Sequence, residues 1–170
     1  MFNEITQEII NGLHETNRDL LKTISLFEQN QFNIIPFKGS WTAGQVAQHV
    51  FKSETGITQL LSSPGKPTSR SPYLNIDEIK LTFLDFTIKM KSPDFILPDE
   101  NEKSKMELYD GLETNREKIM GIANTADLSK TCDSVPGVGE LTGFEWLTFL
   151  ICHSKRHIWQ MQNIYAALTR

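Results

Sequence analysis

Apolar residues recur at the spacing of an α-helix along most of the chain. In the first segment they fall on one helix face: Ile5, Ile9, Leu13, Leu20, Ile24 and Phe27. The same periodicity and its flanking signals predict four further helices, at about 42–61, 76–90, 100–123 and 143–168. No convincing strand pattern interrupts them. The chain is therefore expected to be all-α, with its helices packed as a bundle.

Two of the predicted helix starts carry the same capping signal. Thr42 precedes Gln45 by three residues, and Thr142 precedes Glu145 by three, which is the spacing of a capping box. Apolar residues flank each cap at the positions of a hydrophobic staple: Trp41 with Val46, and Leu141 with Trp146. These helices are therefore placed to begin at the two threonines.

The remaining helix boundaries rest on weaker signals. Asn75 is a candidate cap for the third helix, and Asp99 for the fourth. Composition indicates loops at 62–72, which is rich in serine and proline, and at 127–140. Connections of this length are compatible with crossovers that a simple up-down bundle does not need.

Length, charge and cysteine count narrow the class of protein. The 170 residues fit a single domain, 1–170, with a sizeable core. The net charge of -4 is spread along the chain without a basic stripe, which argues against a nucleic-acid partner. No apolar run approaches the roughly 20 residues that span a bilayer, and no Lys or Arg precedes Arg18, unlike a signal peptide. With only two cysteines, a cytoplasmic protein with free thiols and no membrane partner is expected.

The predicted last helix carries two histidines on its apolar face. His153 and His157 are four residues apart, so their side chains project from nearly the same side. Apolar residues continue this stripe: Trp146, Leu150, Met161, Ile164 and Leu168. Buried neutral imidazoles need partners for their ring nitrogens, and a metal ion meets this need by accepting both lone pairs. An i, i+4 histidine pair is a known zinc-binding arrangement, although the glutamate of an HExxH motif is absent here.

A third ligand is expected from another helix, and only His14 and His49 remain. His49 lies at the edge of the apolar face of the predicted second helix, whereas His14 falls on a polar stretch and is expected to be solvated. His49, His153 and His157 are therefore the predicted metal ligands. Imidazole suits zinc, nickel, copper and iron, so zinc is the default divalent ion, with nickel, iron or manganese as alternatives.

Structural interpretations compete with these assignments. A lone histidine on an apolar face is usually a satisfied core residue, and a purely structural bundle would bind no metal. Cys152 is expected to pack as a small residue, and Arg156 to lie at the surface or rim. The three tryptophans, Trp41, Trp146 and Trp159, are expected in the core or in staples.

Four stretches form an ordered set over nearly the whole chain: WTAGQVAQHV at 41–50, SPDFILP at 92–98, VPGVGELT at 135–142 and CHSKRHIWQM at 152–161. This set resembles the DinB-like family of metal-dependent enzymes. The resemblance implies a four-helix bundle with long crossover connections, in which His49, His153 and His157 hold a divalent metal. The family includes transferases and isomerases that use bacillithiol or mycothiol, and hydrolases. Its name refers to expression under DNA damage, a stress response, and not to DNA binding.

Two classes of function fit such a site. As an enzyme, a metal on three neutral histidines keeps a position open for water or substrate. It could generate a nucleophile for hydrolysis, or activate a low-molecular-weight thiol for transfer to a small electrophilic substrate. Thiol transfer is favoured because the sequence offers no clear general base beside the histidines, and no catalytic residue is assigned. The alternative is a non-catalytic metal-binding bundle for storage, sensing or partner binding, and a homodimer is compatible with either.

Overall fold

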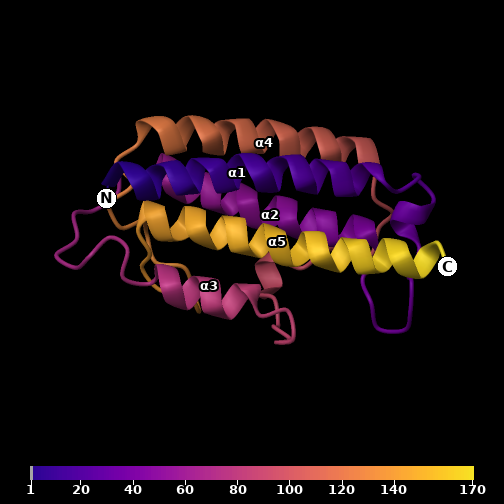
Figure 1. Cartoon of the computed structure of the whole chain (residues 1–170). Helices are drawn as coiled ribbons and strands as arrows, with labels where there is room; N and C mark the ends of the chain where they lie inside the picture. Colours follow the sequence, from indigo (N-terminus) through magenta and orange to yellow (C-terminus); the bar gives the residue numbers. More distant parts are fainter. Residues whose placement is uncertain (1) are drawn as a thin grey trace.

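The computed structural model describes residues 2–170 and is all-helical over that range (Figure 1). Five α-helices and two short 3-10 helices make up the described chain in this order: α1 (Phe2–Ser25), η1 (Gln31–Asn33), α2 (Ala43–Ser62), α3 (Ile76–Leu84), η2 (Asp94–Ile96), α4 (Lys105–Thr125) and α5 (Gly143–Leu168). None of these helices is both long and apolar enough to cross a membrane. The all-α class predicted from the sequence is confirmed.

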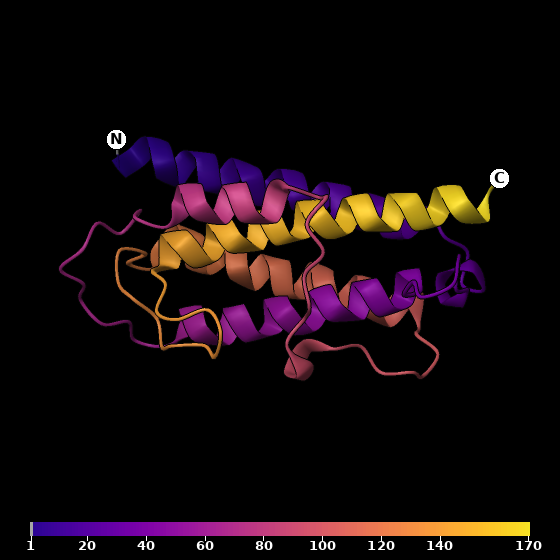
Figure 2. The same cartoon turned by 90° about the horizontal axis from the view of Figure 1, so that it is seen from below.

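Helices α1, α2, α4 and α5 form a four-helix bundle, and α3 packs on the outside of α5. Both α4 and α5 lie beside α1 and α2. α1 and α5 run in one direction, while α2 and α4 run in the other (Figure 1). Because α2 and α4 are parallel, the chain must cross the length of the bundle between them. Residues 63–104, which include α3 and η2, make this crossover (Figure 2), as the long connections in the sequence predict.

α2 and α5 begin where the capping signals place them. The Thr42 hydroxyl accepts a hydrogen bond from the Gln45 N–H at 3.0 Å, and the Gln45 side chain accepts one from the Thr42 N–H at 3.0 Å. Thr142 and Glu145 make the same reciprocal pair at the start of α5. Each pair satisfies two backbone donors that a helix start leaves without partners.

The predicted end of the third helix is wrong. α3 ends at Leu84 rather than near Met90. Beyond Leu84 the backbone turns to place the carbonyls of Asp85 and Ile88 on the guanidinium of Arg156, which projects from α5 and is half-buried. These charge-assisted bonds replace the intrahelical bonds that a longer α3 would make.

Asn75 precedes α3 as its N-cap residue, as predicted, but without the expected side-chain hydrogen bond, and the predicted cap of α4 is wrong. Asn75 makes no side-chain cap, and its backbone N–H donates to Glu145 instead. α4 begins at Lys105 with Ser104 as its cap, several residues later than expected. The carboxylate of Asp99 is engaged elsewhere, since it accepts hydrogen bonds from side chains outside α4. A tertiary contact with Gln48 of α2 therefore overrides the local signal at Asp99.

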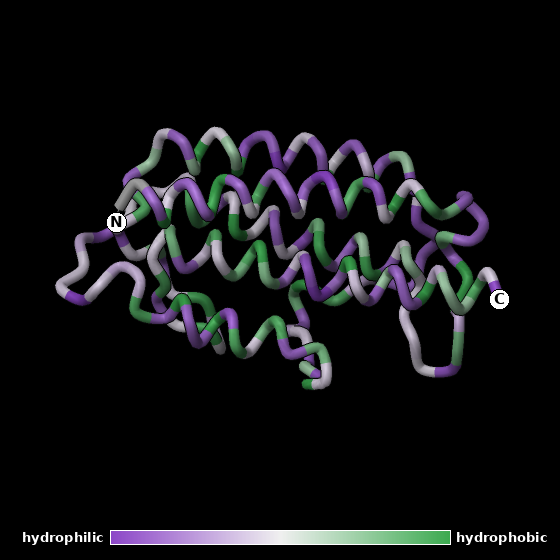
Figure 3. Tube along the Cα trace, in the orientation of Figure 1, coloured by the Kyte–Doolittle hydropathy of each residue, from purple (hydrophilic) through white to green (hydrophobic). Residues whose placement is uncertain are grey.

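The apolar core consists of two clusters at opposite ends of the bundle. One includes Leu147, near the start of α5, and the other includes Met161, near its end. Trp146 belongs to the first cluster and Trp41 packs against the second, so both lie where they were predicted. Hydrophilic and hydrophobic segments alternate along the bundle helices (Figure 3), as amphipathic helices require.

A buried polar layer separates the two clusters. It contains one residue from each bundle helix: Thr16, Glu54, Arg116 and Ser154. The Arg116 guanidinium donates to both carboxylate oxygens of Glu54. It also donates to the hydroxyls of Thr16 at 3.1 Å and Ser154 at 2.6 Å. All four helices therefore meet at one fully paired charge cluster.

Candidate metal centre

The structure brings the three predicted histidines together, two from α5 and one from α2. The Nε2 atom of His153 lies 3.1 Å from Nε2 of His49 and 3.1 Å from Nε2 of His157. One ligand atom from each residue lies within 4.8 Å of the others. α2 and α5 are antiparallel neighbours, so His49 faces the i, i+4 pair across their interface.

The outer nitrogens of two rings are already engaged. His49 Nδ1 donates to the backbone carbonyl of Ile96 at 3.0 Å, and His157 Nδ1 donates to the side-chain oxygen of Gln160 at 2.8 Å. Because these oxygens only accept, both rings carry their proton on Nδ1 and turn the Nε2 lone pair inward. Both lone pairs point at Nε2 of His153, and a single proton there can satisfy only one of them. A cation between the rings would satisfy all three nitrogens.

The spacing of the nitrogens suits such a cation. Imidazole nitrogens at about 2.0–2.1 Å from a tetrahedral ion lie roughly 3.3 Å from one another. The two separations of 3.1 Å are close to this value. His49, His153 and His157 could therefore hold a divalent ion and leave a position for a further ligand.

Burial keeps the three imidazoles neutral. His49, His153 and His157 are 2%, 5% and 8% exposed. Desolvation lowers the pKa of His49, and it lowers the pKa of His153 well below its usual value, with the neighbouring histidines adding to the effect. The pKa of His157 is lowered to about 3, again mainly by burial. Neutral imidazole is the form that binds metal ions.

Aromatic side chains surround the imidazoles. Phe149 stacks on His153 with ring centroids 5.3 Å apart. The ring centroids of Trp41 and His49 are also 5.3 Å apart. Phe83, from α3, lies 6.5 Å from His153 and 4.7 Å from Phe149. This apolar wall limits access of water and strengthens electrostatic interactions at the site.

Other residues singled out in the sequence lie elsewhere. His14 is exposed on α1, as predicted. Cys152 is a buried free thiol that packs inside the fold, also as predicted. The prediction for Trp159 is wrong: it is 45% exposed and stacks on Phe86. Trp159 follows His157 by two positions, which turns its side chain to a different side of α5.

Several groups next to the histidines were missed by the sequence analysis. Gln160 follows His157 by three residues, so helical spacing alone could have indicated its position. Ile96 acts through its backbone carbonyl, for which its side chain gives no signal. The pairing of Glu54 with Arg116 joins residues 62 apart in sequence, and no local pattern predicts it.

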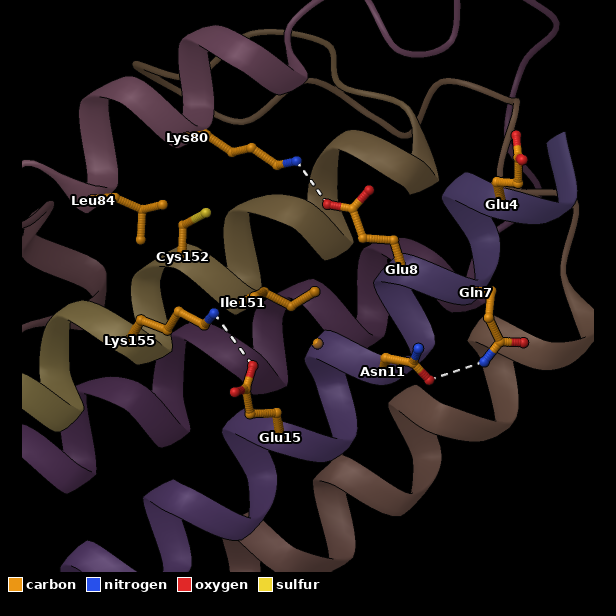
Figure 4. A pocket seen from close by; sticks show the side chains of 11 residues that line it. Glu4, Gln7, Glu8, Asn11, Glu15, Lys80, Leu84, Ile151, Cys152 and Lys155 are labelled. Atoms are coloured by element: carbon orange, nitrogen blue, oxygen red, sulfur yellow. Dashed lines mark hydrogen bonds and ion pairs between the residues drawn. The ribbon is translucent and has the colours of Figure 1, made fainter. Parts of the chain in front are cut away.

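A cavity of about 610 Å³ lies between α1, α3 and α5 (Figure 4). Its two lysines are paired with carboxylates, Lys80 with Glu8 at 2.9 Å and Lys155 with Glu15 at 3.4 Å. Cys152 lies in its wall, but burial raises the pKa of the thiol and so disfavours the reactive thiolate. None of the three histidines lines this cavity, so it is separate from the candidate metal centre.

The bundle and the buried histidine cluster together define a helical-bundle protein with a candidate metal centre. The chain belongs to the DinB superfamily, whose family model matches residues 13–161. Among solved structures, it is similar to YfiT from Bacillus subtilis, described as a probable metal-dependent hydrolase with an unusual four-helix bundle topology. The two share 16% sequence identity with a TM-score of 0.63, over 96% of this chain and 87% of that chain. No curated protein sequence matches the chain.

Proposed function

We propose that this protein is a metal-dependent enzyme that transfers a low-molecular-weight thiol to a small electrophile. His49, His153 and His157 hold the divalent ion. The main support for metal binding is that the inward lone pairs of His49 and His157 both point at His153. Nε2 of each residue lies 3.1 Å from Nε2 of His153. The similarity in fold to YfiT, described as a probable metal-dependent hydrolase, supports a metal as well. Zinc is the default ion, with nickel, iron or manganese as alternatives.

A divalent ion bound here supplies Lewis-acid stabilisation of an anionic nucleophile, either a thiolate or the hydroxide of a hydrolytic reaction. The three imidazoles are neutral, so they add no negative charge that would oppose binding of such an anion. Trp41 and Phe149 restrict water around the rings. In the transfer, sulfur forms a bond to the electrophilic carbon and the leaving group departs with the bonding electron pair. The thiol proton passes to solvent.

The surroundings of the histidines favour thiol transfer over hydrolysis. Among the described residues, no carboxylate is hydrogen-bonded to the three imidazoles. Glu54, the nearest acid to His49 along α2, is bound to Arg116 instead. Hydrolysis usually benefits from a positioned group that moves protons. Thiol transfer needs less help because a thiolate is already a strong nucleophile.

Metal-dependent hydrolysis is the second candidate, favoured by the description of YfiT. A non-catalytic metal-binding bundle is a third outcome. The test supplies zinc-loaded or nickel-loaded protein with bacillithiol, glutathione or cysteine and a reactive aryl halide, and follows adduct formation. The expected result is a rate above that of the His153→Ala variant and of buffer. Equal rates with every thiol would exclude the transferase, and thiol-independent cleavage of an ester or amide would support the hydrolase.

A further inference from the structure

The crossover segment between α3 and α4 contacts the candidate metal centre through the Ile96 carbonyl. Figure 2 shows its backbone crossing the bundle between the two helices. No residue from 85 to 102 is buried, and Phe95 in η2 is 62% exposed. Segments with few buried apolar contacts open at a lower free energy than the core of a protein. Polar contacts must therefore hold this segment in place.

Two side chains of α2 supply such contacts. Lys52 Nζ donates to the carbonyl of Leu97 at 2.7 Å. Gln48 uses both ends of its amide: Nε2 donates to the Asp99 carboxylate at 2.7 Å, and Oε1 accepts from the Asp99 N–H at 2.9 Å. Gln48 and Lys52 are four residues apart and so lie on one face of the helix. Together they fix the backbone of 97–99 against α2.

The carbonyl beside these contacts is the one that binds His49. Ile96 directly precedes Leu97, and its carbonyl oxygen lies 3.0 Å from His49 Nδ1. His49 in turn lies between Gln48 and Lys52 in the sequence of α2. The two flanking side chains therefore bond to the segment on the C-terminal side of this carbonyl, where Lys103 and Gln45 also bond to Asp99.

His157 differs from His49 in this respect. Its Nδ1 partner is Gln160, which belongs to the same helix and moves with it. His49 instead takes its partner from a segment without buried residues. Of these two ligands, only His49 relies on the crossover segment to hold its proton on Nδ1 and its ring in place.

We propose that Gln48 and Lys52 are positioning residues for His49, acting through the backbone of 96–99. This role rests on the proposed binding of a divalent ion by the three histidines. A hydrogen bond from Nδ1 to oxygen orients the ring and makes Nε2 a more basic ligand. Loss of such a partner typically weakens metal affinity about 10- to 100-fold.

The test compares zinc affinity in wild-type protein and in a Gln48→Ala, Lys52→Met double variant, by competition with a chromogenic chelator. The double variant is expected to bind zinc about 10- to 100-fold more weakly. NMR of the zinc-loaded proteins is expected to show faster solvent exchange of the His49 Nδ1–H, with the His157 Nδ1–H unchanged. Gln59→Ala on α2 and Lys91→Met on the crossover segment are matched controls at exposed positions, and both are expected to bind zinc as wild type does.

The outcomes separate this role from the metal centre itself. If wild-type protein binds neither zinc nor nickel, the proposed metal centre is refuted, and the positioning role is refuted with it. Equal zinc affinity and equal His49 Nδ1–H exchange in wild type and double variant would overturn the positioning role alone. Lys52→Arg retains a donor and is expected to keep wild-type affinity. If the double variant loses helical content, the single variants Gln48→Ala and Lys52→Met replace it. Each is expected to bind zinc more weakly while keeping wild-type helical content. Wild-type zinc affinity in both would overturn the positioning role.

Discussion

Ser154, which directly follows His153 in α5, accepts a hydrogen bond at its hydroxyl from the Arg116 guanidinium at 2.6 Å. The buried polar layer and the candidate metal centre therefore share one turn of α5. The charge of Arg116 also contributes, after burial and the neighbouring histidines, to the lowered pKa of His153. Different residues carry the two features, so substitutions can test them separately.

Replacing His153 with alanine is expected to remove metal binding while the helices remain. At free zinc about 100-fold above the Kd, binding stabilises the folded state by about 2.7 kcal/mol. For a chain of this size that raises the Tm of wild type by roughly 5–11 °C, at about 2–4 °C per kcal/mol. His153→Ala should show no such rise. Thermal melts by circular dichroism with and without zinc, together with elemental analysis, measure both effects.

His14→Ala is the matched control for this experiment, because His14 is an exposed histidine on α1. It is expected to show the wild-type rise in Tm. The same rise in His153→Ala would contradict the three-histidine centre. A loss of helical signal in His153→Ala without zinc would show that the residue is needed for folding.

The metal-free protein is expected to lose stability as the pH falls below about 6.5, where an unfolded histidine takes up its proton. Burial lowers the folded-state pKa of His49 and His153, and that of His157 to about 3. Below pH 6.5 the unfolded state therefore binds protons that the folded state does not. Stability is present above the unfolded pKa and is lost as the pH falls toward the folded values. Each histidine adds a slope of up to about 1.4 kcal/mol per pH unit.

Urea denaturation of the metal-free protein across this pH range measures the slope. His157→Gln removes one titrating group, so its stability should fall less steeply than that of wild type. Identical slopes would show that His157 does not titrate differently in the folded and unfolded states. With zinc present, the metal should be released on acidification because protons compete for the same nitrogens.

Breaking the buried ion pair on one side is expected to destabilise the fold strongly. Arg116→Met leaves the Glu54 carboxylate without the guanidinium that binds both its oxygens, and such losses typically cost about 3–5 kcal/mol. The double variant Glu54→Leu, Arg116→Met removes both charges and should cost less than Arg116→Met alone. A double-mutant cycle by denaturant unfolding measures the coupling. Strict additivity of the two substitutions would refute the coupling.

The two threonine caps should differ in their contribution to stability. Thr142 caps α5 and also donates from its hydroxyl to the Pro72 carbonyl at 2.7 Å, whereas Thr42 makes only the capping bonds of α2. Removal of a cap costs roughly 0.5–2 kcal/mol. Thr142→Ala is therefore expected near the upper end of that range and Thr42→Ala near about 1 kcal/mol. Equal losses in urea unfolding would show that the bond to Pro72 contributes little.

The sequence predicts those elements whose signals are local. The start of α2 and both ends of α5 follow from reciprocal caps and an unbroken apolar stripe. The end of α3 and the start of α4 do not, because side chains of other helices, Arg156 and Gln48, bind the backbone near these boundaries. Neither contact produces a periodic pattern in the sequence from which it could be predicted.

The candidate site divides in the same way. His153 and His157 are four residues apart, and their convergence follows from helix geometry alone. His49 could be chosen because only one other histidine competed for the role. The Ile96 carbonyl could not be predicted as the partner of His49, since every residue has a backbone carbonyl. Metal binding itself and the thiol reaction stay predictions that the experiments above address.

The layer of Thr16, Glu54, Arg116 and Ser154 has a consequence for how the bundle comes apart. The core is split into two apolar halves, and without a link between them each half could unfold separately. Detaching α2 or α4, however, would strand one member of a buried ion pair in a low-dielectric interior, at a cost of several kcal/mol. Partial opening is therefore penalised at the middle of the molecule. We therefore expect the polar residues that divide the two halves to make them unfold in a single cooperative transition.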